Sequence, residues 1–264
     1  MSILDRLRAR NHRGVPLART LWIPPLALGV ATGLLGAAVA RAFVDPGQPA
    51  APAFVATIGC VLVAAVGLVD DLVPQRARGL RGHLRALAQG DLTTGTLKVI
   101  VVAGASIYVE AAIGSRSAAG TVAGVLVLAA AANLWNGLDV APGRALKAYL
   151  LVVAAIVLVG LAASVRGWSA ASVCVGVTTG ALLVLPFDLR ERAMLGDAGA
   201  NLLGFAVGIA VVTGSSDAVL VALAVVSVAL NVVAETYTLS RAIDRFAPLR
   251  WLDRVGRLPE APAA

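Results

Sequence analysis

Oxygen-bearing polar side chains gather in three short segments of this 264-residue sequence. The residues are Asp70 and Asp71; Asn133, Asn136 and Asp139; and Asp197, inside the segment Met-Leu-Gly-Asp-Ala-Gly at 194–199. Carboxylate and amide oxygens are ligands of hard divalent cations such as Mg²⁺, which often shares them with phosphate groups. The three segments therefore predict a phosphate-handling metal site, provided that the fold brings them together.

The aspartate pair closes an apolar stretch. If that stretch is a helix, Asp70 and Asp71 lie at its C-terminus, where the helix dipole disfavours negative charge. Two carboxylates at this position need a counter-charge or a cation. The alternative is a solvated loop in which Arg76 and Arg78 neutralise the pair.

The asparagine segment also closes an apolar stretch. Steps of three residues place Asn133, Asn136 and Asp139 along one stripe of a helix. Polar groups at membrane depth are costly unless they are partnered, so this stripe predicts a functional lining. The alternative is a set of hydrogen bonds between helices that only stabilises the bundle.

The third segment has an ordinary structural alternative, because an aspartate just before a helix commonly caps its N-terminus. Two glycines, Gly196 and Gly199, flank Asp197. Glycine allows backbone to approach a ligand closely. The segment therefore favours a ligand site in which Gly196 and Gly199 contact substrate.

The elements that must position these residues are membrane helices. Hydrophobic residues make up 59% of the chain and charged residues 14%, with a mean hydropathy of +0.86, which excludes a soluble cytosolic enzyme. The length rule for a span predicts about eight transmembrane helices, near 20–42, 51–69, 97–113, 119–135, 146–164, 169–187, 199–213 and 217–238. The prediction is an all-α polytopic helical bundle forming one transmembrane domain over 1–264.

The distribution of basic residues predicts the orientation. With both termini cytoplasmic, 19 of the 22 lysines and arginines fall on the cytoplasmic side, and only Arg41, Arg116 and Arg166 fall on the other. All three polar segments then lie at the cytoplasmic face of the plasma membrane. The basic segment 1–19 is assigned to topology and lipid electrostatics, and no nucleic-acid partner is expected.

Two further features have simple interpretations. Cys60 and Cys174 lie in apolar runs and are expected to be small core residues. The cytoplasmic segment 239–264 alternates apolar and basic residues. It fits either an amphipathic helix among anionic headgroups or a solvated tail with a few anchoring aromatic residues.

The three segments, in this order, resemble the polyprenyl-phosphate N-acetylhexosamine-1-phosphate transferase family, the glycosyltransferase family 4 type that includes the phospho-MurNAc-pentapeptide translocase. Asp70-Asp71 with the downstream Gly79-Leu80 and Arg85 is similar to the family's aspartate pair with its Gly-Leu and basic residue. Asn133, Asn136 and Asp139 match its Asn-x-x-Asn-x-x-Asp segment. The segment at 194–199 resembles its Met-Gly-Asp-x-Gly loop.

The resemblance implies Mg²⁺-dependent transfer of a sugar-1-phosphate from a UDP-sugar to a polyprenyl phosphate, with release of UMP, for cell-envelope glycan synthesis. It implies that Asn136 and Asp197 hold the metal. It further implies that Asp70, with Asp71 beside it, acts at the lipid phosphate as base or positioning group. Arg85 would contact phosphate, and Asn133 and Asp139 would support the nucleotide side of the pocket.

A second hypothesis is a family descendant that binds polyprenyl phosphate or nucleotide sugar without turnover, as a regulator or assembly partner. It arises because the family's late histidine-containing loop is missing: the only histidines are His12 and His83. A small-solute transporter is disfavoured, because the polar residues end spans on one face instead of meeting at the bilayer midplane. Gly29, Gly33 and Gly36 have a spacing compatible with helix contact, and a homodimer is left open.

Overall fold

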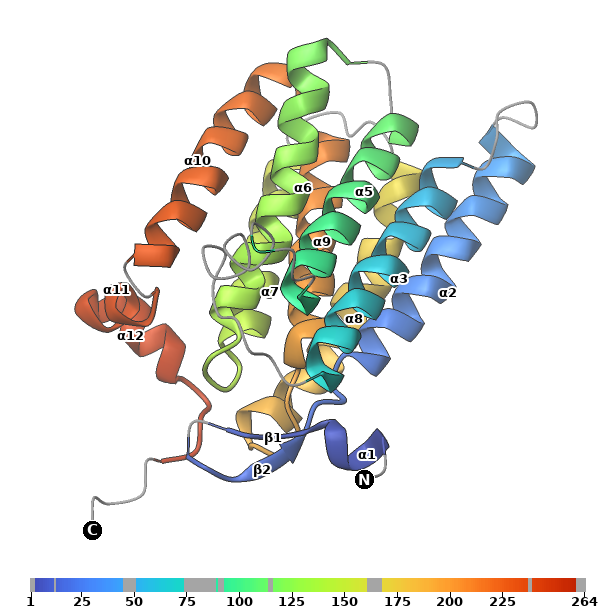
Figure 1. Cartoon of the computed structure of the whole chain (residues 1–264). Helices are drawn as coiled ribbons and strands as arrows, with labels where there is room; N and C mark the ends of the chain where they lie inside the picture. Colours follow the sequence, from blue (N-terminus) through green and yellow to red (C-terminus); the bar gives the residue numbers. More distant parts are fainter. Residues whose placement is uncertain are drawn as a thin grey trace.

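A computed structural model describes residues 3–11, 13–44, 51–73, 89, 93–113, 116–160, 168–236 and 239–259. In these residues long helices run side by side and form one bundle (Figure 1). The long helices are α2 (Ile23–Val39), α3 (Ala51–Leu72), α5 (Thr94–Ile113), α6 (Ala118–Leu138), α7 (Arg144–Gly160), α8 (Trp168–Leu189), α9 (Gly196–Gly214) and α10 (Asp217–Thr236). The predicted all-α polytopic membrane bundle is confirmed.

Seven of these helices, with α2 counted together with its continuation to Ala42, are long and apolar enough to cross a membrane. The remaining one, α7, has 17 residues, which is at the lower limit of a spanning helix. The predicted span there extends to 164, and residues 161–167 lie outside the described part of the chain. Each of the eight predicted spans therefore corresponds to a helix, although their ends differ by a few residues.

Two of these end differences matter for function. Helix α3 continues to Leu72, so Asp70 and Asp71 lie within its last turn. Helix α6 continues to Leu138, so Asn133 and Asn136 are helical and Asp139 follows as the C-cap residue. The polar residues thus extend the apolar helices by about one turn beyond the predicted spans.

Helix α9 lies at the centre of the bundle and contacts α3, α6, α7 and α8. In α9, 83% of the apolar spanning stretch is buried inside the bundle, whereas in α10, at the edge, 11% is buried. Small residues allow this packing: a Cβ added at Gly204 would lie 2.3 Å from the Ala131 carbonyl oxygen of α6. Helix α9 is therefore the rigid support from which Asp197 projects.

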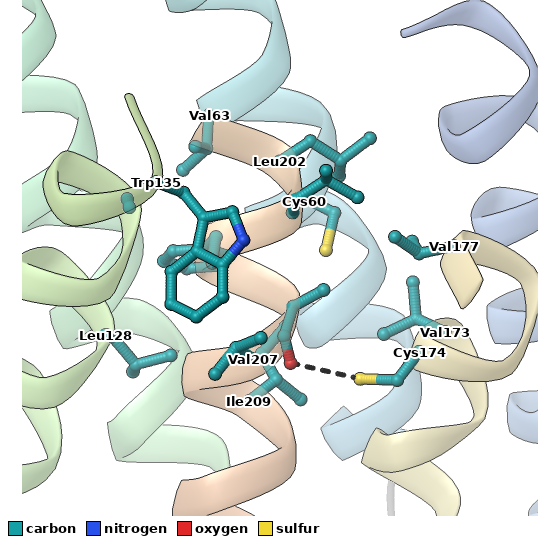
Figure 2. Close-up of a cluster of buried hydrophobic side chains, with 14 of the residues drawn as sticks. Cys60, Val63, Leu128, Trp135, Val173, Cys174, Val177, Leu202, Val207 and Ile209 are labelled. Atoms are coloured by element: carbon teal, nitrogen blue, oxygen red, sulfur yellow. Dashed lines mark hydrogen bonds between the residues drawn. The ribbon is translucent and has the colours of Figure 1, made fainter. Parts of the chain in front are cut away.

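The core around α9 is built mainly from aliphatic side chains, with three aromatic residues, Trp135, Tyr149 and Phe205. It also contains the two cysteines (Figure 2). Cys60 and Cys174 are both buried and free, and the Cys174 thiol donates a hydrogen bond to the Ala206 carbonyl oxygen at 3.3 Å. The prediction that both cysteines are core residues is confirmed. The indole N–H of Trp135 donates to the Ala145 carbonyl oxygen, which ties α6 to the start of α7.

The basic N-terminus is structured, which the sequence analysis did not predict. A short helix α1 (Ile3–Arg6) precedes an antiparallel hairpin of β1 (Arg8–Arg10) and β2 (Pro16–Ala18). The hairpin packs beneath the bundle, at the end where α3 stops and α9 starts (Figure 1). It is held there by a bridge between Arg19 and Met194.

The C-terminal segment forms two more short helices, α11 (Leu239–Arg245) and α12 (Ala247–Arg254). They lie outside the bundle, next to the end of α10 that faces the hairpin (Figure 1). A five-residue π-helix, η1 (Ala40–Val44), continues α2 at the opposite end. The end that carries the hairpin and the C-terminal helices is called the site end below.

Candidate active site

Lys98 is the centre of the polar residues at the site end. Its ammonium lies 3.1 Å from Asp70 Oδ2 and 2.7 Å from Asp197 Oδ2. With its amide oriented to satisfy both neighbours, Asn136 donates to Asp197 Oδ1 at 3.2 Å and accepts from Lys98 Nζ at 3.1 Å. One residue from each of the three sequence segments therefore meets around a single cation, Lys98, contributed by a fourth helix.

These four side chains, called the Lys98 centre below, come from four helix ends. Asp70 lies in the last turn of α3, Lys98 in the first turns of α5, Asn136 near the end of α6 and Asp197 in the first turn of α9. A Cβ added at Gly67 would lie 2.6 Å from the Asp197 carbonyl oxygen, so α3 and α9 are in backbone contact. The close approach of these two helices brings the carboxylates of Asp70 and Asp197 to one lysine.

Asp71 lies on a different side of α3 from Asp70, and both of its carboxylate oxygens have partners. Its Oδ1 pairs with Arg19 Nη1 at 2.8 Å, and its Oδ2 accepts the Ala198 backbone N–H at 3.3 Å. Gly196, beside it, has φ +73°, and an added Cβ would lie 2.7 Å from Asp71 Oδ2. Glycine is therefore required at 196 both by its conformation and by the nearby carboxylate.

Asp197 does not cap its helix. The N-cap residue of α9 is Leu195, which makes no side-chain cap hydrogen bond. The carboxylate instead reaches Lys98, and about 31% of the side chain is exposed, whereas that of Asp70 is 2% exposed. Asp197 is thus the accessible carboxylate of the Lys98 centre, and its place in the first helical turn is favoured by the dipole.

Asn133 and Asp139 do not reach Lys98. Asn133 Nδ2 donates to Asn231 Oδ1 of α10 at 2.6 Å, and Asn231 in turn donates to the Ala130 carbonyl oxygen. The structure therefore gives Asn133 the contact that the bundle-stabilising alternative describes. Gly199 likewise lies in a helix contact, because an added Cβ would meet the Leu195 side chain and Trp22 Cβ.

Asp139 lines a cavity of about 260 Å³ next to the Lys98 centre. The N-terminal hairpin forms one wall of this cavity and the loops after α6 and α8 form the rest; the lining residues are Arg10, Asn11, Leu17, Asp139, Val140, Ala141, Pro142, Asp188, Glu191, Ala193 and Met194. Desolvation raises the pKa of Asp139 well above its ordinary value, and the carboxylates of Asp188, Asp197 and Asp71 raise it further.

The loop after α8 fixes the hairpin wall of the cavity. Glu191 has a left-handed backbone with φ 51°, and its carboxylate accepts from Asn11 Nδ2 at 2.5 Å and pairs with Arg13 at 3.3 Å. Asp188 accepts the Gly143 backbone N–H at 2.7 Å. The cavity is therefore bounded by two loops that are each held by a carboxylate.

The donor set suits a hard cation that also binds substrate phosphates. Within the described ranges, no three carboxylate, imidazole or thiol side chains form a ready metal cluster. Two carboxylates and one amide converge on one point, however, and Asp70 Oδ1 is buried without a hydrogen-bond partner there. Mg²⁺ commonly takes one or two protein carboxylates and completes its shell with water and phosphate, and these residues fit that requirement.

The comparison with known families decides the identity. The model of glycosyl transferase family 4 matches residues 53–215, which is more than half of the chain and includes all three polar segments. The chain belongs to glycosyl transferase family 4. Members of this family are phosphoglycosyl transferases, and the polyprenyl-phosphate sugar-phosphate transferase family recognised in the sequence is confirmed. No curated protein matches the chain.

Two members of the site in this family 4 protein were not singled out from sequence. Lys98 and Arg19, predicted only as cytoplasmic charges, neutralise Asp70, Asp71 and Asp197. A basic partner could have been predicted from the sequence, because a pair of carboxylates at a helix C-terminus requires cations. Arg85 lies outside the described residues, as do Arg76, Arg78 and the Gly79-Leu80 dipeptide.

Proposed function

We propose that this family 4 protein transfers a sugar-1-phosphate from a UDP-sugar to a polyprenyl phosphate, with Mg²⁺ and with release of UMP. The reaction takes place at the cytoplasmic face of the plasma membrane. The observation that carries the proposal is the convergence of Asp70, Asn136 and Asp197 on Lys98 at one end of a membrane bundle. Such a site lets a water-soluble donor meet an acceptor that stays in the bilayer.

The bonds of the reaction balance without a redox partner. An oxygen of the polyprenyl phosphate attacks the sugar-bearing phosphorus of the donor, and the bond from that phosphorus to the bridging oxygen breaks. UMP leaves with the electron pair. The product is a polyprenyl diphosphate sugar. Phosphoryl transfer of this kind depends on positioning and charge neutralisation more than on covalent participation by the protein.

The charge balance of the site supports a metal requirement. Asp70, Asp71 and Asp197 oppose only Lys98 and Arg19 within their ion pairs. This set is one negative charge in excess before any phosphate enters. Mg²⁺ held by Asp197 and Asn136 would neutralise the diphosphate of the donor and polarise the phosphorus.

The chain's own residues have distinct roles in this proposal. Asp70 lies at the lipid phosphate and either accepts its remaining proton or orients it, while the Lys98 ammonium offsets the repulsion between the two anions. Asp71 is a positioning residue, because one of its oxygens pairs with Arg19 and the other accepts the backbone N–H of Ala198, directly after Asp197. Asp139, which lines the cavity, accepts hydrogen bonds from the nucleotide side of the donor.

The test is UMP release by the purified protein with undecaprenyl phosphate and a panel of UDP-sugars, with and without Mg²⁺. Release that needs both lipid and metal, and that Asp197→Asn abolishes, supports the proposal and names the donor. Asp217→Asn is a matched control, since Asp217 occupies the first turn of α10, the next helix along the chain, at the opposite end of the bundle. Binding of UDP-sugar or lipid without any turnover would replace the transferase by the non-catalytic alternative.

A further inference from the structure

Helix α12 presents an outward stripe that the site does not use. Ala247, Arg250, Trp251 and Arg254 are spaced as neighbours on one helical face, and with Val255 they line an open groove of about 470 Å³. All five residues are exposed, and Trp251 is 70% exposed. Phe246 and Leu249, at 58% and 45% exposure, add apolar surface beside the stripe.

The acidic residue of α12 faces the opposite way. Asp253 is buried and forms a two-point ion pair with Arg144, at 2.8 and 2.9 Å, and it also binds Arg257. Burial raises the pKa of Asp253, but these guanidiniums outweigh that effect and hold it below its ordinary value. The outward stripe therefore keeps only cationic and apolar side chains.

The same contacts set the level of α12 relative to the bilayer. Arg144 and Lys147 belong to the first turn of α7, and the Lys147 ammonium binds the carbonyl oxygens of Leu252 and Val255. Helix α12 is thus fastened beside the start of α7, one of the long helices of the bundle. Figure 1 shows α12 outside the bundle and below the end of α10.

We propose that this face of α12, formed by Ala247, Arg250, Trp251 and Arg254, binds the phosphate headgroups of anionic phospholipids. Guanidinium groups bind phosphate through paired hydrogen bonds, and indole rings favour the level of the headgroups. Arg250 and Arg254 are four residues apart and repel each other on a bare helix, so an anion shared between them relieves the repulsion. One Arg250 nitrogen donates to the Asp244 carbonyl oxygen, which holds that side chain along the groove.

The proposal is independent of the transferase reaction, because none of these residues contacts the Lys98 centre. Attraction between basic residues and an anionic leaflet is long-ranged and is weakened by salt. Binding through α12 would hold the loop after α6 at the membrane surface through Arg144. A zwitterionic bilayer has the same hydrocarbon core but no net negative charge. Comparing it with an anionic bilayer therefore isolates the effect of headgroup charge.

The test places a nitroxide label on Ala247→Cys in the full chain, where both native cysteines are buried. The protein is reconstituted in nanodiscs of phosphatidylcholine alone or of phosphatidylcholine with phosphatidylglycerol. Collision of the label with oxygen, relative to a polar nickel chelate, reports its depth. We expect a several-fold higher ratio in the discs that contain phosphatidylglycerol, and added salt should reduce the difference.

Arg250→Gln with Arg254→Gln should remove the difference between the two lipids, whereas the matched pair Arg6→Gln with Arg8→Gln should leave it unchanged. Arg250→Lys with Arg254→Lys keeps the charge and should retain most of the effect. Equal ratios in both lipids for the unmodified face would overturn the proposal, and so would a difference that survives loss of both arginines. A label in water under both conditions would indicate a soluble partner or none, and would overturn it as well.

Discussion

Lys98 holds together carboxylates that would otherwise repel one another. Asp70 and Lys98 are nearly buried, at 2% and 13% side-chain exposure, and the ammonium joins Asp70 to Asp197. A buried carboxylate that loses its partner costs several kcal/mol, so the lysine stabilises the fold as well as balancing the charge. In the proposed reaction Mg²⁺ would share the Asp197 carboxylate with Lys98, so an effect of the lysine on metal binding can be measured.

Lys98→Met should raise the stabilisation that Mg²⁺ gives to the protein. Without the ammonium, Asp70 and Asp197 keep their mutual repulsion until a metal neutralises it, so the variant should unfold at a lower temperature. Added Mg²⁺ should then raise its Tm by more than it raises the Tm of the unmodified protein. Lys147→Met is the matched control, because Lys147 lies in α7 and binds the carbonyl oxygens of Leu252 and Val255. An equal effect of Mg²⁺ on all three proteins would show that the metal binds elsewhere.

Gly196→Ala should destabilise the protein by about 1–3 kcal/mol and reduce activity, because a positive φ and a Cβ near Asp71 are both unfavourable. Two other glycines separate the causes. Gly14 has φ +77° in open space, and Gly104 has open space without a positive φ. In chemical unfolding, the loss in free energy of unfolding should be largest for Gly196→Ala, smaller for Gly14→Ala and smallest for Gly104→Ala. A Gly14→Ala variant as unstable as Gly196→Ala would exclude a role for the Asp71 contact.

Asp139→Asn should stabilise the protein at neutral pH and impair activity. The pKa of Asp139 is raised in the folded state, so its ionisation costs stability as pH rises from about 3.9, the ordinary value, through the raised pKa. Below that window the folded and unfolded states are both protonated and the substitution should be nearly neutral. Tm measured against pH tests this: the gain from Asp139→Asn should grow with pH, and a gain that is the same at all pH values contradicts it.

The residue types of the site could be predicted from sequence, but their pairings could not. Asp70, Asn136 and Asp197 were expected to converge, and they do so around Lys98. The even spacing of Asn133, Asn136 and Asp139 predicts one shared direction, yet a neighbouring helix binds Asn133 and the end of α6 turns Asp139 toward the cavity. Partner choice depends on which helices are neighbours, and spacing along one helix does not contain that information.

At the scale of the elements, apolar length was sufficient to locate all eight helices. It could not locate their ends, since polar residues such as Asp71 and Asn136 remain helical when other helices partner them. It also gave no indication of the hairpin formed by β1 and β2. That hairpin is stabilised by main-chain bonds to Met194, nearly 180 residues away, and a local pattern carries no sign of such a contact.

The loop between α5 and α6 should control stability without affecting the site. At the end of the bundle opposite the site, Arg116 pairs with Glu110 at 3.1 Å and with Asp217 at 3.3 Å, and the Glu110 side chain is 1% exposed. Arg116→Met should cost about 3–5 kcal/mol, because a buried carboxylate loses its partner. UMP release per folded molecule should remain unchanged.

Two variants complete that experiment. Replacing both partners, as in Arg116→Met with Glu110→Met, should recover much of the stability, since an apolar pair of similar size removes the unpaired charge. Arg41→Met changes an exposed arginine at the same end and should have little effect. If the double variant is as unstable as Arg116→Met alone, the loss comes from the arginine's bonds to the Ser215 and Val212 carbonyl oxygens instead.

For the molecule as a whole, the distribution of charge predicts that the site end faces the cytoplasm. Among the residues that the structure describes, Arg41 and Arg116 are the basic residues at the opposite end. A cysteine at Arg41 or Ser216 should therefore react with an impermeant maleimide on intact cells, whereas one at Arg8 should react only after permeabilisation. The buried native cysteines provide a low background. Labelling in the reverse pattern would invert the proposed orientation.

The central position of α9 also governs when the site can exist during synthesis. Chains are made from the N-terminus, so Asp70 and Lys98 enter the membrane about a hundred residues before Asp197. In that interval the lysine and the first aspartate can neutralise each other at the site end of the growing bundle. Insertion of α9 among helices already in place then adds the second aspartate. A chain whose synthesis stops before residue 197 lacks Asp197 and cannot complete the Lys98 centre.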